Sequence, residues 1–176
     1  MAKTRAVICA SPHAGGVCDA LCADAVRQLE ERFPCDIALS LSVVGLSIEG
    51  CIGCDRCRRT YRCFQRDDMG DVLRVFDVAD ELYVASPVYF AGPPSQFKAL
   101  LDRLQPRYWE WLDTPREQRP QKKPAHLLAV GEGGDPHGCD PLVACTRSAL
   151  APAGFDLAAV QVALGTEPDA AGWLAD

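Results

Sequence analysis

The sequence lacks any long hydrophobic run. Its longest apolar segments have the length of a β-strand, whereas a membrane-spanning helix needs about 20 apolar residues. The apolar segment near the start, residues 6–10, is also too short for the hydrophobic region of a secretory signal peptide. We therefore expect a cytoplasmic protein without a membrane partner.

Positive charge is also scarce. The chain has 18 lysines and arginines against 24 aspartates and glutamates, a formal net charge of -6. A nucleic-acid surface needs clustered basic residues on one face. The dense basic run, Arg56, Arg58, Arg59, Arg62 and Arg66, is interleaved with cysteines. It suits a metal cluster or a small anion at least as well, so we expect no nucleic-acid partner.

Cysteine, by contrast, is abundant, with 10 residues among 176. Because no signal peptide is expected, the pattern predicts reduced thiols, metal ligands or redox centres rather than a disulfide framework. Six cysteines are scattered, mostly in apolar or helical patterns, and we expect them to be small core residues. They are Cys9, Cys18, Cys22, Cys35, Cys139 and Cys145.

The other four cysteines lie close together with the spacing C-x2-C-x2-C-x5-C. They are Cys51, Cys54, Cys57 and Cys63. Four cysteines hold an iron–sulfur cluster, and bacterial ferredoxin sequences begin with the same two intervals, so the spacing predicts a [4Fe–4S] cluster. Zinc fits less well because structural zinc sites use two pairs separated by a longer stretch. A disulfide or free thiols are the further alternatives.

Strand-like and helical segments alternate along the chain. Short apolar runs predict strands at residues 5–10, 36–44, 81–86, 125–131 and 155–164. Helical periodicity predicts helices at residues 17–32, 67–78, 94–104 and 140–153. Residues 105–123 are polar and contain prolines, so we expect a long connection there, and the acidic residues 165–176 are expected to be loosely held.

This alternation predicts a three-layer α/β sandwich. Strands that are apolar throughout are buried on both faces, which indicates a parallel sheet with helices on each side. Five strands in this length favour the strand order 2-1-3-4-5. We expect one domain over residues 1–176, with a cysteine-rich insert at about 47–66. In this architecture a ligand binds beyond the carboxyl ends of the strands.

The loop after the first predicted strand has the composition of a phosphate-binding loop. Small residues allow the backbone to wrap a phosphate, and the amides at a helix start point toward the anion. The candidate residues are Ser11, His13, Gly16, Val17 and Cys18. The alternative is an ordinary glycine-containing turn.

The loops after the third and fourth strands complete the predicted site. Pro87, Val88, Tyr89 and Phe90 form an apolar, proline-stiffened segment that suits a flat aromatic ligand, although both aromatics could instead be core residues. Gly133 and Gly134 allow close approach of backbone to a ligand. No acid–base catalyst stands out, because His13 and Tyr89 suit structural roles or ring contacts better.

These residues also carry a resemblance to a known family. Ser11-Pro12…Gly15-Gly16 resembles the phosphate loop of the NADPH-dependent FMN reductase superfamily, and residues 86–90 with 96–103 resemble its second flavin loop and following helix. The four clustered cysteines, followed by Asp67-Asp68-Met69, are similar to the iron–sulfur flavoprotein branch.

The resemblance implies a flavodoxin-like fold that binds FMN without a covalent link. By matched position, Ser11, Val17 and Cys18 would face the phosphate, and Pro87–Phe90 with Gly133 and Gly134 would surround the ring. It also implies NAD(P)H or an electron-carrier protein as the redox partner. Family members are commonly dimers or tetramers, so a homodimer or homotetramer is expected.

Three positions depart from the family pattern. Ala10 stands where glycine is usual, and Val17 and Cys18 stand where asparagine and threonine or serine are usual. The loss of side-chain donors leaves phosphate binding to Ser11 and backbone amides. We therefore expect weaker FMN binding than is typical of the family.

Two functions follow from this reasoning. The first is an FMN-dependent enzyme that uses NAD(P)H to reduce flavin, quinone or another small acceptor. The alternative is an iron–sulfur flavoprotein that carries electrons between protein partners such as ferredoxin. A phosphatase of similar architecture needs an arginine five residues after its nucleophilic cysteine, and none follows Cys9 at that distance.

Overall fold

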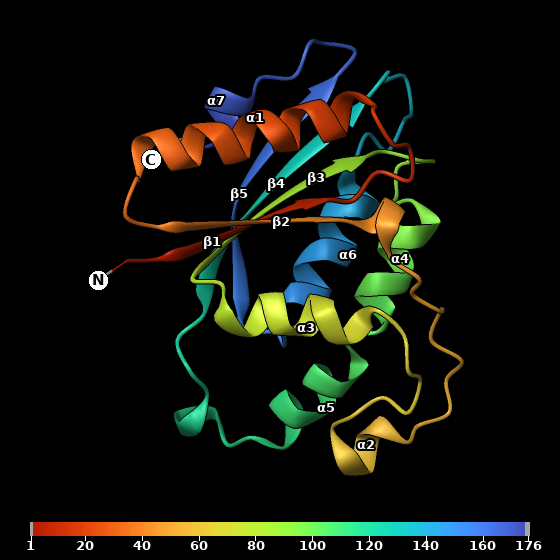
Figure 1. Cartoon of the computed structure of the whole chain (residues 1–176). Helices are drawn as coiled ribbons and strands as arrows, with labels where there is room; N and C mark the ends of the chain where they lie inside the picture. The colour runs from red at the N-terminus through yellow and green to blue at the C-terminus, as the bar shows by residue number, and fades with distance from the viewer. Residues whose placement is uncertain (1, 175–176) are drawn as a thin grey trace.

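The computed structural model describes residues 2–174, which form a five-stranded parallel sheet (Figure 1). The strand order β2-β1-β3-β4-β5 confirms the predicted 2-1-3-4-5 topology. The strands are β1 (Thr4–Cys9), β2 (Ile37–Ser42), β3 (Glu81–Pro87), β4 (Lys123–Gly131) and β5 (Phe155–Leu164).

The order in which strands are added to the sheet reverses at β1: β2 lies on one side of it, and β3, β4 and β5 follow on the other. This strand pairs with β2 on one side and with β3 on the other, so that Cys9 lies opposite both Ser42 and Ala85. The connections that leave β1 and β3 therefore lead to opposite faces of the sheet. Folds with this topology bind ligands beyond the carboxyl ends of the strands, where two such connections diverge.

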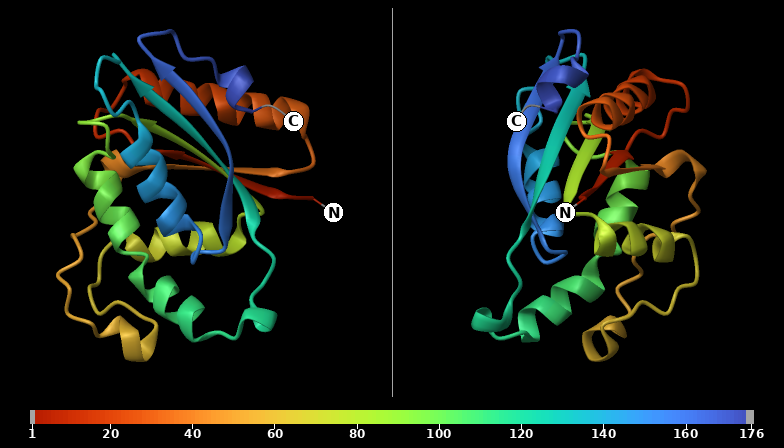
Figure 2. Two further views of the ribbon diagram at one scale, coloured as in Figure 1. Left: turned by 180° about the vertical axis from the view of Figure 1, so that it is seen from behind. Right: turned by 60° about the vertical axis from the view of Figure 1, so that its left-hand side comes forward.

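Helices cover both faces of the sheet (Figures 1 and 2). The helices α1 (Val17–Arg32) and α7 (Ala170–Trp173) lie on one face, and α3 (Met69–Val78), α4 (Ser95–Asp102) and α6 (Asp140–Leu150) lie on the other. Each face has its own hydrophobic cluster. The predicted sandwich is confirmed.

Local patterns explain these elements. In α1 the buried residues Cys18, Cys22, Ala25 and Leu29 recur every three or four positions and form a single apolar stripe against the sheet. In β1 every residue after Thr4 is buried, as expected for a strand covered on both faces.

Two expectations about irregular segments were wrong. Residues 105–123 contain the helix α5 (Gln105–Asp113) and the short turn η2 (Arg116–Gln118). Pro106 occupies the first turn of α5, where its missing amide costs no hydrogen bond. The prolines and polar residues therefore begin a helix that packs on the cysteine-rich segment instead of forming a plain connection.

The segment after β5 is also anchored in the described region. Asp169 caps α7 by accepting hydrogen bonds from the amides of Ala171 (2.9 Å) and Gly172 (3.3 Å). The ring of Trp173 is buried edge-on against Tyr83, with 5.8 Å between ring centroids. The expectation of a loosely held tail is therefore wrong up to Leu174; its last two positions lie outside the described residues.

Within residues 2–174, no helix has the length and apolar character needed to cross a membrane.

Candidate functional site

The three predicted ligand loops lie at the same edge of the sheet, beyond the arrowheads of β1, β3 and β4 (Figure 1). We call them the edge loops: residues 10–16, 88–94 and 132–139. Two backbone hydrogen bonds tie this edge together. The amide of Val88 donates to the carbonyl of Val130, and that of Gly165 donates to Gly131, each at 2.8 Å.

The first edge loop is a compact turn before α1. The hydroxyl oxygen of the buried Ser11 accepts a hydrogen bond from the amide of His13 at 3.1 Å. A Cβ atom on Gly16 would lie 2.7 Å from the ring of the exposed His13, so a larger residue at this position would require that ring to move. Among residues 2–174, no side chain caps α1 at Gly16, which leaves the first helical amides available to an anion.

The side chains of Val17 and Cys18 differ in their surroundings. Val17 is exposed at the helix start, whereas Cys18 is buried in the core. Burial, with smaller contributions from Cys9 and Asp19, raises the pKa of Cys18 to about 12, so its thiol is protonated at neutral pH. Cys18 can therefore contribute its backbone amide to a phosphate, whereas its side chain faces inward.

Asp19 is a feature of this loop that sequence reasoning missed. Its carboxylate accepts a hydrogen bond from the amide of Gly15 at 2.7 Å. Hydrogen bonds from Cys9 and from Gly15 lower the pKa of Asp19, so it carries a negative charge near the proposed phosphate position. An acidic residue in the first turn of a helix was the available signal. It gives a second reason to expect weak phosphate binding.

The second edge loop contains a tight turn in an unfavourable conformation. Tyr89 and Gly92 exchange two backbone hydrogen bonds of 2.9 Å, and the two residues between them have left-handed backbone, with φ of 51° at Phe90 and 61° at Ala91. This geometry usually requires glycine or asparagine, and other residues held in it cost about 1–3 kcal/mol each.

Neighbouring structure holds that turn in place. Ala91 is buried, and its carbonyl accepts a hydrogen bond from the amide of Leu142 in α6 at 3.0 Å. The turn therefore presents Phe90, which is 100% exposed, and Tyr89, which is 48% exposed. The alternative that these two aromatics are core residues is wrong. Strain maintained at a displayed aromatic pair is typical of a binding loop.

The third edge loop approaches the second through glycines. Gly133 and Gly134 have φ of 82° and 85°, a conformation that side chains disfavour. A Cβ atom on Gly131 would lie 3.1 Å from Leu164 and 3.4 Å from Val88. The third edge loop therefore starts beside Val88, at the same end of the sheet as Pro87–Phe90, whereas Gly133 lies against the end of β5.

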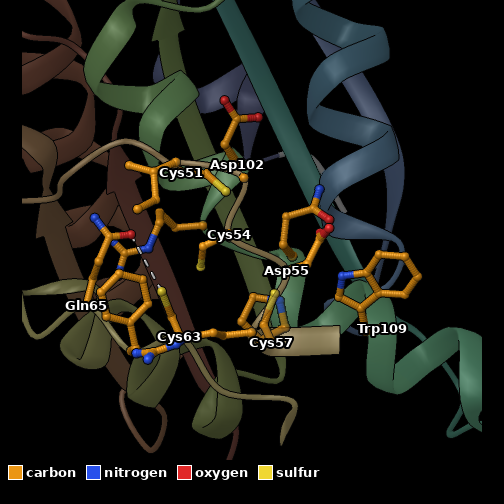
Figure 3. A pocket seen from close by; sticks show the side chains of 15 residues that line it. Cys51, Cys54, Asp55, Cys57, Cys63, Gln65, Asp102 and Trp109 are labelled. Carbon is orange, nitrogen blue, oxygen red and sulfur yellow. Dashed lines mark hydrogen bonds between the residues drawn. The ribbon is translucent and has the colours of Figure 1, made fainter. Parts of the chain in front are cut away.

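The four clustered cysteines line a separate cavity of about 320 Å³, beneath α4 and beside α5 (Figure 3). They belong to the cysteine loop, residues 46–66, whose one regular element is the short helix α2 (Cys57–Thr60). Cys51 and Cys54 are exposed, and Cys57 and Cys63 are half-buried. All four are free thiols. Burial, followed by repulsion from the other three thiols, raises the pKa of Cys57.

The four sulfur atoms surround a space without converging on one point (Figure 3). Among residues 2–174, no group of three or more His, Cys, Asp or Glu side chains is close enough to hold a single metal ion. A four-iron cluster places each thiolate on a different iron, so its ligands need not converge. The arrangement therefore fits zinc less well than a cluster.

A buried ion pair holds the cysteine loop to the core. The guanidinium of Arg103, at the end of α4, donates two hydrogen bonds to the Asp67 carboxylate, with Nη1–Oδ2 of 2.5 Å and Nη2–Oδ1 of 3.0 Å. Nη1 also donates to the carbonyl of Glu49 at 2.8 Å. Arg103 thus grips the chain both before and after the cysteines, and this contact was not predicted from the sequence.

One helix connects the edge loops with the cysteine cavity. Pro94, at the end of the second edge loop, is the N-cap of α4, and Arg103 is its C-cap. Eight residues of α-helix span roughly 12 Å at 1.5 Å per residue. A ligand at the exposed aromatic pair and a group in the cavity would therefore lie at the two ends of one short rigid element.

Two tryptophans of α5 pack on their own chain. Trp109 lines the cysteine cavity, and the Arg58 guanidinium lies over its ring at 4.9 Å from the centroid. The Arg119 guanidinium lies over Trp111 at 3.9 Å. These contacts hold both rings against arginines of the same chain.

Comparison with protein families and curated proteins gives consistent matches. A family model described as NADPH-dependent FMN reductase matches residues 5–169. The chain is similar to an iron–sulfur flavoprotein of Methanocaldococcus jannaschii, 34% identical over 88 residues that cover 50% of this chain and 42% of that protein. One of Methanosarcina thermophila is 33% identical over 97 residues, covering 54% and 49%. The matched regions span less than half the length of these relatives.

Solved structures share the fold at low sequence identity. A flavone reductase superposes with a TM-score of 0.67 at 15% identity, over 92% of this chain and 54% of that chain. An azoreductase from Bacillus anthracis superposes with a TM-score of 0.64 at 15% identity, over 93% and 87%. At these identities the similarity establishes the flavodoxin-like architecture alone.

Proposed function

The chain belongs to the NADPH-dependent FMN reductase family, and we propose that it uses NAD(P)H to reduce flavin, quinone or another small acceptor through bound FMN. Family membership supports a flavin-dependent oxidoreductase; the electron donor and the acceptor are finer parts of our proposal. The observation that best supports FMN binding is the meeting of three ligand-type loops at one sheet edge, with Tyr89 and Phe90 exposed.

Each edge loop has a distinct role in this proposal. The Ser11 hydroxyl and the amides at the start of α1 bind the phosphate, and the Gly16 backbone allows its close approach. Pro87–Phe90 provide the apolar wall for the ring, and Gly133 and Gly134 approach it with backbone groups. When bound, FMN accepts a hydride as an electron pair and releases electrons singly.

Flavin titration with a loop variant tests this assignment. Phe90→Ala removes a stacking surface worth about 0.5–1.5 kcal/mol, so we expect the Kd for FMN to rise by about two- to tenfold. Ile37→Ala, an exposed apolar residue at the opposite sheet edge, is the control and should leave the Kd unchanged. Wild-type protein that binds no FMN at millimolar concentration contradicts the proposal.

For the cysteine cavity we propose a [4Fe–4S] cluster held by Cys51, Cys54, Cys57 and Cys63. Four free thiols around a cavity of about 320 Å³ fit such a group. The Nε of Arg103, in the wall of this cavity, is buried and has no hydrogen-bond partner among residues 2–174, so it is available as a donor to a sulfur atom. The cluster, when present, supplies one-electron transfer.

Anaerobic reconstitution with iron and sulfide tests this second assignment. We expect about four iron and four sulfide atoms per chain and a broad absorption shoulder that bleaches on reduction. Binding of a single zinc ion, or no metal retained by a chain that binds FMN, contradicts the cluster but leaves the flavin proposal intact.

A second candidate function is electron transfer between protein partners. The arginines of the cysteine loop favour it: Arg56, Arg58, Arg59, Arg62 and Arg66 are exposed, and none forms an ion pair within residues 2–174. An unneutralised basic surface beside a redox centre suits an acidic carrier such as a ferredoxin.

Steady-state kinetics separate the two functions. Rapid NADPH or NADH oxidation with a small acceptor supports the enzyme. Slow turnover combined with fast, salt-sensitive reduction by reduced ferredoxin supports the carrier. The subunit number, for which a homodimer or homotetramer is proposed, and the cytoplasmic location belong to the same proposal.

A further inference from the structure

Arg103 is the largest fully buried side chain in the described part of the protein, with 2% of its surface exposed. The helix before it, α4, contributes Leu100 and Leu101 to the hydrophobic core, and Leu104 directly after it is also buried there. A charge in such surroundings is costly unless it is paired and hydrogen-bonded. Each nitrogen of Arg103 therefore needs an acceptor.

The two terminal nitrogens of Arg103 are occupied. Nη1 and Nη2 donate to the Asp67 carboxylate, and Nη1 donates also to the carbonyl of Glu49. The third nitrogen, Nε, is buried and has no hydrogen-bond partner within residues 2–174. It is the one charged group among the buried polar atoms that lack a partner there.

This unpartnered donor belongs to the wall of the cysteine cavity. Arg103 lines the cavity together with the four clustered cysteines. Cys63 lines the same cavity. An arginine side chain stays positively charged in proteins, and a sulfur of a thiolate or cluster is the kind of acceptor that Nε lacks.

We propose that Arg103 is a positioning residue of the cysteine cavity that also sets the reduction potential of the cluster. It grips Glu49 and Asp67, at the two ends of the cysteine loop, and it directs Nε toward a sulfur atom. This inference rests on the proposed [4Fe–4S] cluster and goes beyond it, because it assigns the control of potential to one residue outside the ligand set.

The direction of the effect follows from charge. A cluster with four thiolates is an anion, and reduction adds one electron without forming or breaking a bond. A buried cation and a hydrogen bond to sulfur stabilise the more negative, reduced state. Loss of Arg103 should therefore lower the midpoint potential.

The test compares two buried arginines in the reconstituted, FMN-loaded protein. Arg103→Gln removes the charge, and Arg103→Lys keeps it without the planar set of donors. Arg5 is the matched control, since it is also buried and paired with two carboxylates, Asp36 and Glu81, yet it lies at the opposite end of the sheet. Midpoint potential by EPR-monitored titration, iron per chain and the Kd for FMN are measured.

We expect Arg103→Gln to shift the midpoint potential downward and to retain less iron than wild type. Arg103→Lys should give a smaller downward shift, and Arg5→Gln should give none. The Kd for FMN should stay within about twofold in every variant. If Arg103→Gln loses the cluster altogether while FMN binding persists, the positioning role is supported and Arg103→Lys reports the potential.

Two results overturn the inference. The first is an unchanged midpoint potential in an Arg103→Gln or Arg103→Lys protein that holds a full cluster. The second is an equal loss of iron from the Arg103 and Arg5 variants, which would indicate general destabilisation. Wild-type protein that cannot be reconstituted refutes the proposed cluster itself and with it this inference, and is recognised before any variant is made.

Discussion

The edge loops and the cysteine loop are held in different ways. The edge loops follow β-strands directly, and backbone hydrogen bonds such as Val88 to Val130 fix their course. The cysteine loop has one four-residue helix, which packs on α5, and side chains hold its two ends: Arg103 donates to the carbonyl of Glu49 and to Asp67, and Asp67 accepts from the amide of Glu49. The first site is held by strand ends and backbone hydrogen bonds, whereas the second relies more on side chains.

This difference has a consequence for ligand binding. A site made of backbone amides and glycines exists before its ligand arrives, because the sheet has already fixed the chain. A site made of exposed thiols on a loop with little regular structure gains order from its ligand, as metal sites commonly do. We therefore expect flavin binding and cluster binding to respond to different substitutions.

The largest effect should come from replacing a cluster ligand. We expect Cys57→Ser to abolish cluster formation, because three thiolates leave one iron without its protein ligand, while the Kd for FMN stays within about twofold. Cys35→Ser, an exposed cysteine outside the cluster, is the control. Iron analysis measures cluster binding and flavin titration measures FMN binding. If Cys57→Ser lost both the cluster and FMN, the two sites would not be independent.

The next effect concerns the ion pair that joins the cysteine loop to the core. Arg103→Met leaves the Asp67 carboxylate without its positively charged partner. We therefore expect the free energy of unfolding to fall by about 3–5 kcal/mol. Urea denaturation of the metal-free protein measures this. The double variant Arg103→Met with Asp67→Asn should recover part of the loss, and full additivity would contradict a direct coupling.

The third prediction concerns Glu81, which lies at the end of the sheet opposite the edge loops. A hydrogen bond from His126, with others from Tyr83 and Arg5, lowers the pKa of Glu81 to about 2 despite burial. The associated stability is present above the ordinary pKa of 4.5 and is lost as the pH falls toward 2.

We expect Glu81→Gln to cost about 2–3 kcal/mol at pH 7 and to flatten the decline in stability between about pH 5 and pH 2. Thermal or urea denaturation across this range checks it. The Kd for FMN at pH 7 should not change, because this edge does not contact the edge loops. A matching change in flavin affinity would show that the two ends of the sheet are coupled.

The smallest expected effect tests the phosphate loop. Val17→Asn places a side-chain donor at the exposed start of α1, and we expect FMN to bind about tenfold more tightly, since a hydrogen bond to a charged group contributes about 1.5 kcal/mol. Val78→Asn, at an exposed position of α3, is the control. Unchanged affinity in Val17→Asn would place the phosphate elsewhere.

Local patterns in the sequence determined the architecture. Apolar strands alternating with amphipathic helices indicated a parallel sheet with two helical layers, and the family motifs placed candidate ligand residues in the loops after β1, β3 and β4. Such patterns are properties of short segments, because burial on one or two faces fixes their periodicity. The spacing of the four clustered cysteines can likewise be read directly from the sequence.

Contacts between distant segments could be decided only by the tertiary structure. The Arg103–Asp67 pair joins residues 36 positions apart, and no local pattern distinguishes that arginine from a surface one. The same holds for the exposed turn at Phe90, which α6 holds in place through Leu142, and for α5, whose polar sequence becomes helical where it packs on the cysteine loop. The energy of these features comes from burial and hydrogen bonds that exist only once the chain has folded.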